Sequence, residues 1–211
     1  MAKIFIDLGA HNGGTVAKAL REFPDFDLYI GYEPVKVLYD EAVAKFAGNN
    51  RVRLYNFAVD VQKDNLVEVI FYEDMSDAKD GSTFFKDKIT GKLKPARCLS
   101  IPIDQVFGGI SRDDHVILSL DIEGKEYDIL EYLLDSGLMK LVDKLYCEWH
   151  QNRIPSIHEE RHKQLVKRLQ QEGFDVTGES RDEFGYKRAL DLRHRLGGFL
   201  HQSLRWMQSC V

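Results

Sequence analysis

The chain has 211 residues, 44% of them apolar and 30% charged, which fits one globular domain better than two. Charged residues interrupt every apolar stretch before the roughly 18 to 20 residues of a membrane span, and Lys3 and Asp7 interrupt the N-terminal run that a signal peptide needs. Because neither a membrane span nor a signal peptide is indicated, we expect a cytoplasmic protein with no membrane partner. The net charge of −5 separately argues against a dedicated nucleic-acid binder.

Apolar runs of strand length alternate with segments of helical period through most of the chain. This alternation is typical of a mostly parallel sheet with helices on both faces, a doubly wound α/β fold. We treat residues 1–211 as a single domain. The strands are expected at residues 4–8, 28–32, 52–57, 116–120 and 141–148.

Two further strand-like segments, residues 66–72 and 97–103, interrupt the alternation. Between them lies a polar run, residues 73–96, rich in Asp, Lys and Gly. A loop of this length inside a compact domain is usually a lid, a binding loop or a disordered segment. We therefore expect a hairpin insertion over about residues 66–103, whose tip at residues 80–83 folds over a ligand.

The C-terminal quarter begins with a helix signal. Ser156 and Glu159 match a capping box, which predicts a helix through about residue 172. Two more strands are expected at residues 174–177 and 187–192, followed by a helical tail over about residues 194–211. This part is net basic, which admits a small anionic partner, although a solvated helix face is the more ordinary meaning of mixed charges.

A glycine-rich turn follows the first expected strand, from Asp7 to Gly14. In open α/β sheets, ligands bind outside the carboxyl ends of the strands. His11 stands where a dinucleotide fingerprint needs its middle glycine, and no Gly-Lys-Ser/Thr follows, which excludes a phosphate-binding P-loop. An acidic residue before the glycines suits a ligand with a cationic amino group.

The second expected strand ends at Glu33, about twenty residues beyond the glycines. A carboxylate at this place can accept hydrogen bonds from both hydroxyls of a ribose. Asp7, the glycine turn and Glu33, in this order and spacing, together indicate a site for S-adenosylmethionine.

Two acidic motifs follow later strands: Asp-Ile-Glu-Gly-Lys-Glu at residues 121–126 and Glu-Trp-His at residues 148–150. With the segments at 6–10, 33–34 and 56–59, they resemble the FkbM family of S-adenosylmethionine-dependent methyltransferases. The resemblance implies a class I methyltransferase (Rossmann-like) fold with a seven-stranded sheet, the last strand antiparallel. It also implies O-methylation of a hydroxyl on a sugar or another small metabolite.

The same resemblance, carried over position by position, assigns the cofactor site. Two departures stand out: His11 replaces the usual Asn, and Ser119 replaces a usual Lys, which removes a positive charge beside the acidic motif. Cover for the substrate must come from residues 73–96, from the tail, or from a second subunit in a homodimer. The implied cofactor residues are Asp7, Gly9, Ala10, His11, Asn12, Gly13, Glu33, Pro34, Asn56, Phe57, Ala58 and Asp121.

Methylation of an aliphatic hydroxyl needs a base or a metal ion to lower the pKa of that hydroxyl. The catalytic candidates at the strand ends are Asp121, Glu123, Glu148 and His150. We hypothesise that His150 is the general base and that Asp121 or Glu148 orients it. The alternative that stays open gathers Asp121, Glu148 and His150 around Mg²⁺ or Mn²⁺.

His158 and His162 match the His-Glu-x-x-His pattern of zinc peptidases. No convincing third ligand follows, so we interpret them as ordinary histidines on a half-buried helix stripe. Two other functions also remain open. One is an enzyme of the same fold acting on RNA or protein, and the other is a binding module that keeps the cofactor pocket without the chemistry.

Overall fold

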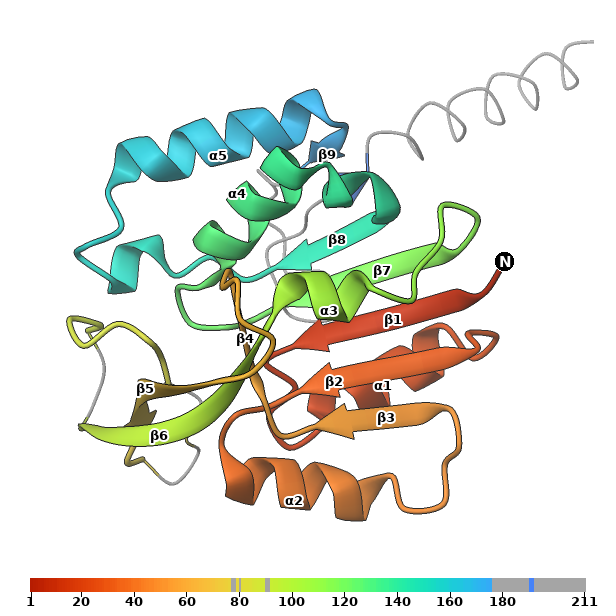
Figure 1. Cartoon of the computed structure of the whole chain (residues 1–211), viewed down its shortest axis with the longest axis horizontal. Helices are drawn as coiled ribbons and strands as arrows, with labels where there is room; N and C mark the ends of the chain where they lie inside the picture. Colours follow the sequence, from red (N-terminus) through yellow and green to blue (C-terminus); the bar gives the residue numbers. More distant parts are fainter. Residues whose placement is uncertain (77–78, 80, 90–91, 176–189, 192–211) are drawn as a thin grey trace, which may run out of the picture.

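The computed structural model of the chain describes residues 1–76, 79, 81–89, 92–175 and 190–191. Among these residues, five parallel strands form the central sheet in the order β3-β2-β1-β7-β8 (Figure 1). The sequence order reverses between β1 and β7, and ligands of open α/β sheets bind at such a switch point. The strands are β1 (Lys3–Leu8), β2 (Leu28–Tyr32), β3 (Val52–Tyr55), β7 (His115–Leu120) and β8 (Lys144–Cys147).

Helices cover both faces of this sheet because strand side chains alternate between the faces. Ile4 and Ile6 of β1 belong to a core shared with α3, α4 and α5, whereas Phe5 packs with α1 on the opposite face. These contacts confirm the predicted α/β fold with a mostly parallel sheet. The helices are α1 (Gly14–Glu22), α2 (Lys36–Lys45), α3 (Ile103–Phe107), α4 (Glu126–Ser136) and α5 (Glu159–Gln171).

None of the helices in the described ranges combines the length and the apolar character that crossing a membrane requires.

The expected seven-stranded sheet is not confirmed, because the described residues place five strands in it. β9 (Phe174–Asp175) and β10 (Leu190–Asp191) instead pair antiparallel in a sheet of their own, and β10 contacts β8. Most of residues 174–177 and 187–192 and all of the expected tail at 194–211 lie outside the described residues.

A second sheet lies at the carboxyl ends of the central strands, on the left in Figure 1. Its order is β4-β6-β5, with β4 (Ala58–Asp60), β5 (Val67–Asp74) and β6 (Leu93–Pro102). β5 and β6 pair antiparallel, and β4 runs parallel to β6. The strand expected over residues 52–57 therefore ends early, at Tyr55, and the chain leaves the central sheet.

The Asn56 side chain anchors the chain where it leaves the central sheet. Its Nδ2 donates hydrogen bonds to the carbonyl oxygens of Glu33, at 2.8 Å, and Pro34, at 3.1 Å. These bonds tie the end of β3 to the loop after β2, and the chain then starts β4 at Ala58.

Two sequence-based expectations near the C-terminus are wrong: the start of the strand expected at residues 141–148, and the capping box before α5. β8 begins at Lys144, since Gly137 at a φ of 78° leads into the 3-10 helix η1 (Leu138–Leu141). The capping box is also absent: His158 is the N-cap of α5 and makes no side-chain cap bond. The Ser156 amide and hydroxyl instead donate to the Asp87 carboxylate, at 2.8 and 3.2 Å.

Candidate cofactor and catalytic site

A half-open cavity lies at the carboxyl ends of β1, β2 and β7, under residues of the β5–β6 loop. Its empty volume, including space open to solvent, is about 840 Å³. Seven of the expected cofactor residues line it, together with the expected catalytic residue Glu123. The seven are Gly9, His11, Glu33, Pro34, Phe57, Ala58 and Asp121.

The glycine turn brings backbone close to backbone at the cavity wall. Gly9 has a φ of +92°, and a Cβ built there would stand 1.9 Å from the carbonyl oxygen of Asp121. The amides of Gly9 and Ala10 both donate to the Tyr32 carbonyl, at 3.0 and 2.9 Å. Only glycine therefore allows β1 and β7 to approach at this point, which places Asp121 beside the turn.

Glu33 joins the glycine turn to the end of β2. Its Oε2 accepts the His11 amide and its Oε1 accepts the Val35 amide, both at 2.8 Å. Burial raises the pKa of Glu33, and these two backbone hydrogen bonds oppose the rise. Each carboxylate oxygen has a second lone pair, so Glu33 retains acceptor capacity toward the cavity.

The other five expected cofactor residues do not line this cavity. Asn12 meets Lys45 through its carbonyl and its side chain, and Gly13 packs against Phe46. Ala10 and Asn56 lie in the turn and in the loop after β3. Asp7 is fully buried under the turn, opposite Ser119 in register, and neither of its carboxylate oxygens has a standard hydrogen bond among the described residues.

We expect Asp7→Asn to remove a pH dependence of stability between about pH 4 and pH 7. Burial raises the pKa of Asp7 from 3.8 to about 7, opposed by the Ser119 hydroxyl and assisted to a smaller extent by the charge of Glu33. The folded chain therefore retains a proton that the unfolded chain releases, and the free energy of unfolding falls as the pH rises through this window. The whole effect is at most about 4 kcal/mol, at about 1.4 kcal/mol per pKa unit.

Urea unfolding of the wild type and the variant across this pH range measures the effect. The difference between their unfolding free energies should change steadily from pH 4 to pH 7 and level off above it. Parallel pH profiles would show that Asp7 ionises normally.

The four expected catalytic residues meet around one imidazole nitrogen. His150, which is 1% exposed, follows β8, and its Nε2 lies 3.1 Å from Glu123 Oε2. The same nitrogen lies 3.7 Å from Asp121 Oδ1 and 3.7 Å from Glu148 Oε1. The ends of β7 and β8 therefore bring together side chains from two separate sequence motifs.

The residue that orients His150 differs from the expected one. We expected Asp121 or Glu148, but the Nδ1 of His150 lies 2.6 Å from Oε1 of Glu126, in the first turn of α4. The other oxygen of Glu126 accepts the Gly124 amide at 2.7 Å. A short bond from a buried, fixed carboxylate holds the ring more firmly than two longer contacts can.

The charges in this cluster shift the titration of its members. Burial lowers the pKa of His150, but the hydrogen bond to Glu126 and the charges of Glu126, Glu123 and Asp121 outweigh it and raise that pKa to about 9. Burial also raises the pKa of Asp121 well above its usual range, opposed by the charge of His150. Ionisable groups perturbed in this way are typical of active sites.

Two residues that no sequence motif marks hold Glu123 in place. Lys88, whose side chain is 1% exposed, forms an ion pair with the Glu123 carboxylate and donates to the Gly81 carbonyl at 2.9 Å. The Thr83 hydroxyl donates to the Glu123 carbonyl. Both come from the loop between β5 and β6, so this loop packs onto the site. The positive charge missing at Ser119 thus reaches the acidic cluster from another segment.

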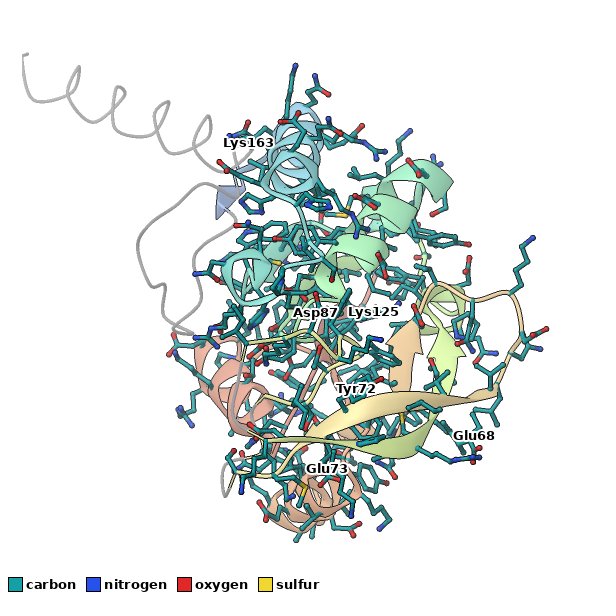
Figure 2. The ribbon with its side chains drawn as sticks, turned by 90° about the vertical axis from the view of Figure 1, so that its left-hand side faces the viewer. Glu68, Tyr72, Glu73, Asp87, Lys125 and Lys163 are labelled. Atoms are coloured by element: carbon teal, nitrogen blue, oxygen red, sulfur yellow. The ribbon has the colours of Figure 1, made fainter. Side chains whose placement is uncertain are left out.

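Figure 2 looks onto this edge of the molecule, with Lys125 and Asp87 near its centre and Tyr72 on β5 beneath them. Lys125 lines the cavity and bridges Asp60 of β4, at 2.7 Å, and Asp128 of α4, at 2.8 Å. The second sheet and α4 are therefore joined across the mouth of the cavity.

The His-Glu-x-x-His pair lies apart from this cluster. His162 Nδ1 stands 2.9 Å from the Tyr127 hydroxyl, and Glu159 pairs with Lys163 at 2.7 Å. In the part of the chain that the structure describes, the group with metal-ligand spacing is Asp121, Glu123 and His150. The interpretation of His158 and His162 as ordinary helix histidines stays a prediction.

Comparisons with known proteins assign the class of protein. The family model described as the methyltransferase FkbM domain matches residues 7–176, so the chain belongs to the FkbM methyltransferase family. A solved structure, the methyltransferase FkbM from Methylobacillus flagellatus KT, is similar with 13% sequence identity and a TM-score of 0.49. That match covers 79% of this chain but 37% of the other chain. The comparison with curated proteins gives no match.

Proposed function

We propose that this FkbM-family chain transfers a methyl group from S-adenosylmethionine to a hydroxyl of a sugar or another small metabolite. The observation that supports the proposal most is that two residues belong both to the cavity lining and to the cluster around His150. Asp121 and Glu123 line the cavity that contains the glycine turn and Glu33, and both also surround His150 Nε2. A cofactor cavity and an ionisable cluster therefore meet at two side chains.

The residues of the cavity fit the cofactor by their chemistry. Glu33 has acceptor capacity for ribose hydroxyls, and Pro34, Phe57 and Ala58 offer an apolar surface for a flat base. Gly9 has no side chain to obstruct a ligand at the turn. When bound, the cofactor supplies a methyl group on a sulfonium centre. A cation at this end of the cavity would favour the ionised form of the Asp121 carboxyl, whose pKa burial raises.

The same charges select the acceptor. Four carboxylates, of Asp121, Glu123, Glu126 and Glu148, face two cationic groups, Lys88 and His150. A phosphodiester would be repelled here, so a neutral polyhydroxyl acceptor fits better than RNA. The reaction needs a group that receives the hydroxyl proton, and the cluster provides several within a few ångströms.

Isotopically labelled S-adenosylmethionine tests this proposal. The purified chain should transfer labelled methyl groups to small molecules in a metabolite extract, and treatment of the product with base should leave the label in place, as expected for an ether. Glu33→Ala, assayed in parallel, should transfer far less at limiting cofactor. Label recovered in RNA or protein, or no transfer together with tight cofactor binding, would contradict the proposal.

A further inference from the structure

The acidic cluster around His150 contains a buried ring nitrogen that has no hydrogen-bond partner among the described residues. His150 Nε2 is inaccessible to solvent and makes no hydrogen bond among the described residues, although three carboxylates surround it. A buried polar atom without a partner is costly and calls for a ligand or a function. We propose that Asp121, Glu123 and His150 bind a divalent cation of the Mn²⁺ type, at the wall where the acceptor hydroxyl binds.

The imidazole is already oriented as a metal ligand. Its Nδ1 faces Oε1 of the fully buried Glu126 at 2.6 Å, which directs the lone pair of Nε2 toward the three carboxylates. Carboxylate–histidine pairs of this kind commonly fix the ring in metal sites and raise the basicity of the ligand nitrogen. Glu126 itself is held by the Gly124 amide.

The spacing of the ligand atoms also suits a cation. One ligand atom from each of Asp121, Glu123 and His150 lies within 4.8 Å of the others. Ligands on opposite sides of an ion with bonds of about 2.1 Å stand about 4.2 Å apart, so small side-chain movements complete the site. Glu148 Oε1, at 3.7 Å from Nε2 and half exposed, lies close enough to serve as a further ligand.

The charge of the cluster favours a doubly charged ion. Lys88 is bound to Glu123 and to the Gly81 carbonyl, and Glu126 is matched by the His150 ring and the Gly124 amide. Asp121 and Glu148 each approach His150 Nε2 at 3.7 Å, and their charges stay uncompensated by the ring when the imidazole is the neutral form that binds a metal. Oxygen ligands with one imidazole suit Mn²⁺.

The backbone at Glu123 fits a built site. Glu123 adopts a φ of 54°, which is uncommon for a residue with a side chain, and Gly124 follows at 113°. The Thr83 hydroxyl fixes the Glu123 carbonyl, and a Cβ at Gly124 would stand 2.3 Å from Ile154 Cδ1. This turn aims the Glu123 carboxylate at His150.

The role of the cation, although not its binding, rests on the proposed function. Because Asp121 and Glu123 line the cavity, the cation would contact the acceptor hydroxyl and lower its pKa. The hydroxyl proton would pass to Glu148 or solvent while the oxygen forms a bond to the methyl carbon. The carbon–sulfur bond would break with its electron pair remaining on sulfur, which would leave a methyl ether and a neutral thioether.

Mn²⁺ titrated into the chelator-treated chain, without S-adenosylmethionine, tests the site. Electron paramagnetic resonance of the free ion should report a single saturable site, and Asp121→Asn and His150→Ala should each weaken binding by more than about tenfold. The matched control is His158→Ala, which removes a histidine outside the cluster and should bind as the wild type does. Thermal melting verifies that each variant is folded, and the partly exposed Asp121 serves where His150→Ala fails to fold.

Calorimetry with S-adenosylmethionine, run on the same samples, separates this inference from the proposed function. Cofactor binding without saturable Mn²⁺ binding would overturn the cation site and leave the methyltransferase proposal standing. Mn²⁺ binding that survives in Asp121→Asn and His150→Ala would also overturn it, because the ion would then bind elsewhere.

Discussion

His150→Ala is expected to lower the turnover of methyl transfer by about 10²- to 10⁴-fold, the range for removing a positioned acid–base group. The reason is geometric: Nε2 of His150 is the point that Asp121, Glu123 and Glu148 share. Removal of the ring impairs deprotonation of the acceptor hydroxyl, whether the ring acts as a base or as a metal ligand. Initial rates at saturating S-adenosylmethionine measure the loss, and calorimetry should find cofactor affinity within about threefold of the wild type.

His115→Ala is the matched control. His115 also faces a carboxylate, since its Nδ1 lies 3.3 Å from Asp143, but this pair stands at the opposite end of the same two strands. The control should keep nearly full turnover. A His150→Ala enzyme that works at the wild-type rate would show that the proton leaves through another group.

Glu33→Ala is expected to weaken S-adenosylmethionine binding by about tenfold to more than a hundredfold. Hydrogen bonds to a charged group contribute about 1.5 to 3 kcal/mol, and about 1.4 kcal/mol changes affinity tenfold. The variant also frees the amides of His11 and Val35, which loosens the glycine turn. Calorimetric titration with the cofactor gives the affinity directly.

Asp114→Ala controls for the loss of structure. Asp114 likewise accepts two backbone amides, of Ala2 at 2.6 Å and Ser111 at 2.9 Å, but it does not line the cavity. The Asp114→Ala variant should be less stable than the wild type and should bind the cofactor with the same affinity. Equal affinity in Glu33→Ala and the wild type would remove Glu33 from the cofactor site, and preferential binding of NAD would contradict the cofactor assignment.

Much of the site could be predicted because the residues that carry it follow strands. Apolar periodicity located β1, β2 and β7 to within one residue, and parallel strands bring their carboxyl ends to one edge. Gly9, Glu33 and Asp121 therefore lie at the cavity, as the sequence predicts. The parallel pairing of the five central strands also agrees with the alternation of strands and helices.

Contacts between distant segments could not be predicted in this way. Lys88 reaches Glu123 across 35 positions, and Ser156 binds Asp87 across 69, which is why the local capping box did not form. A Lys or Thr in a polar loop has no period or spacing that marks it as buried. The orienting role of Glu126 was missed for a related reason, because it depends on the angle between β8 and the first turn of α4.

A crystal structure of the chain with S-adenosylhomocysteine tests the central claim most directly. The ribose hydroxyls should lie within hydrogen-bond distance of the Glu33 carboxylate, and the sulfur should point toward the wall that Asp121 and Glu123 share with His150. A ligand bound outside this cavity, or one with its sulfur turned away from Asp121, would contradict the assignment of the strand-end cavity as the methyl-transfer site.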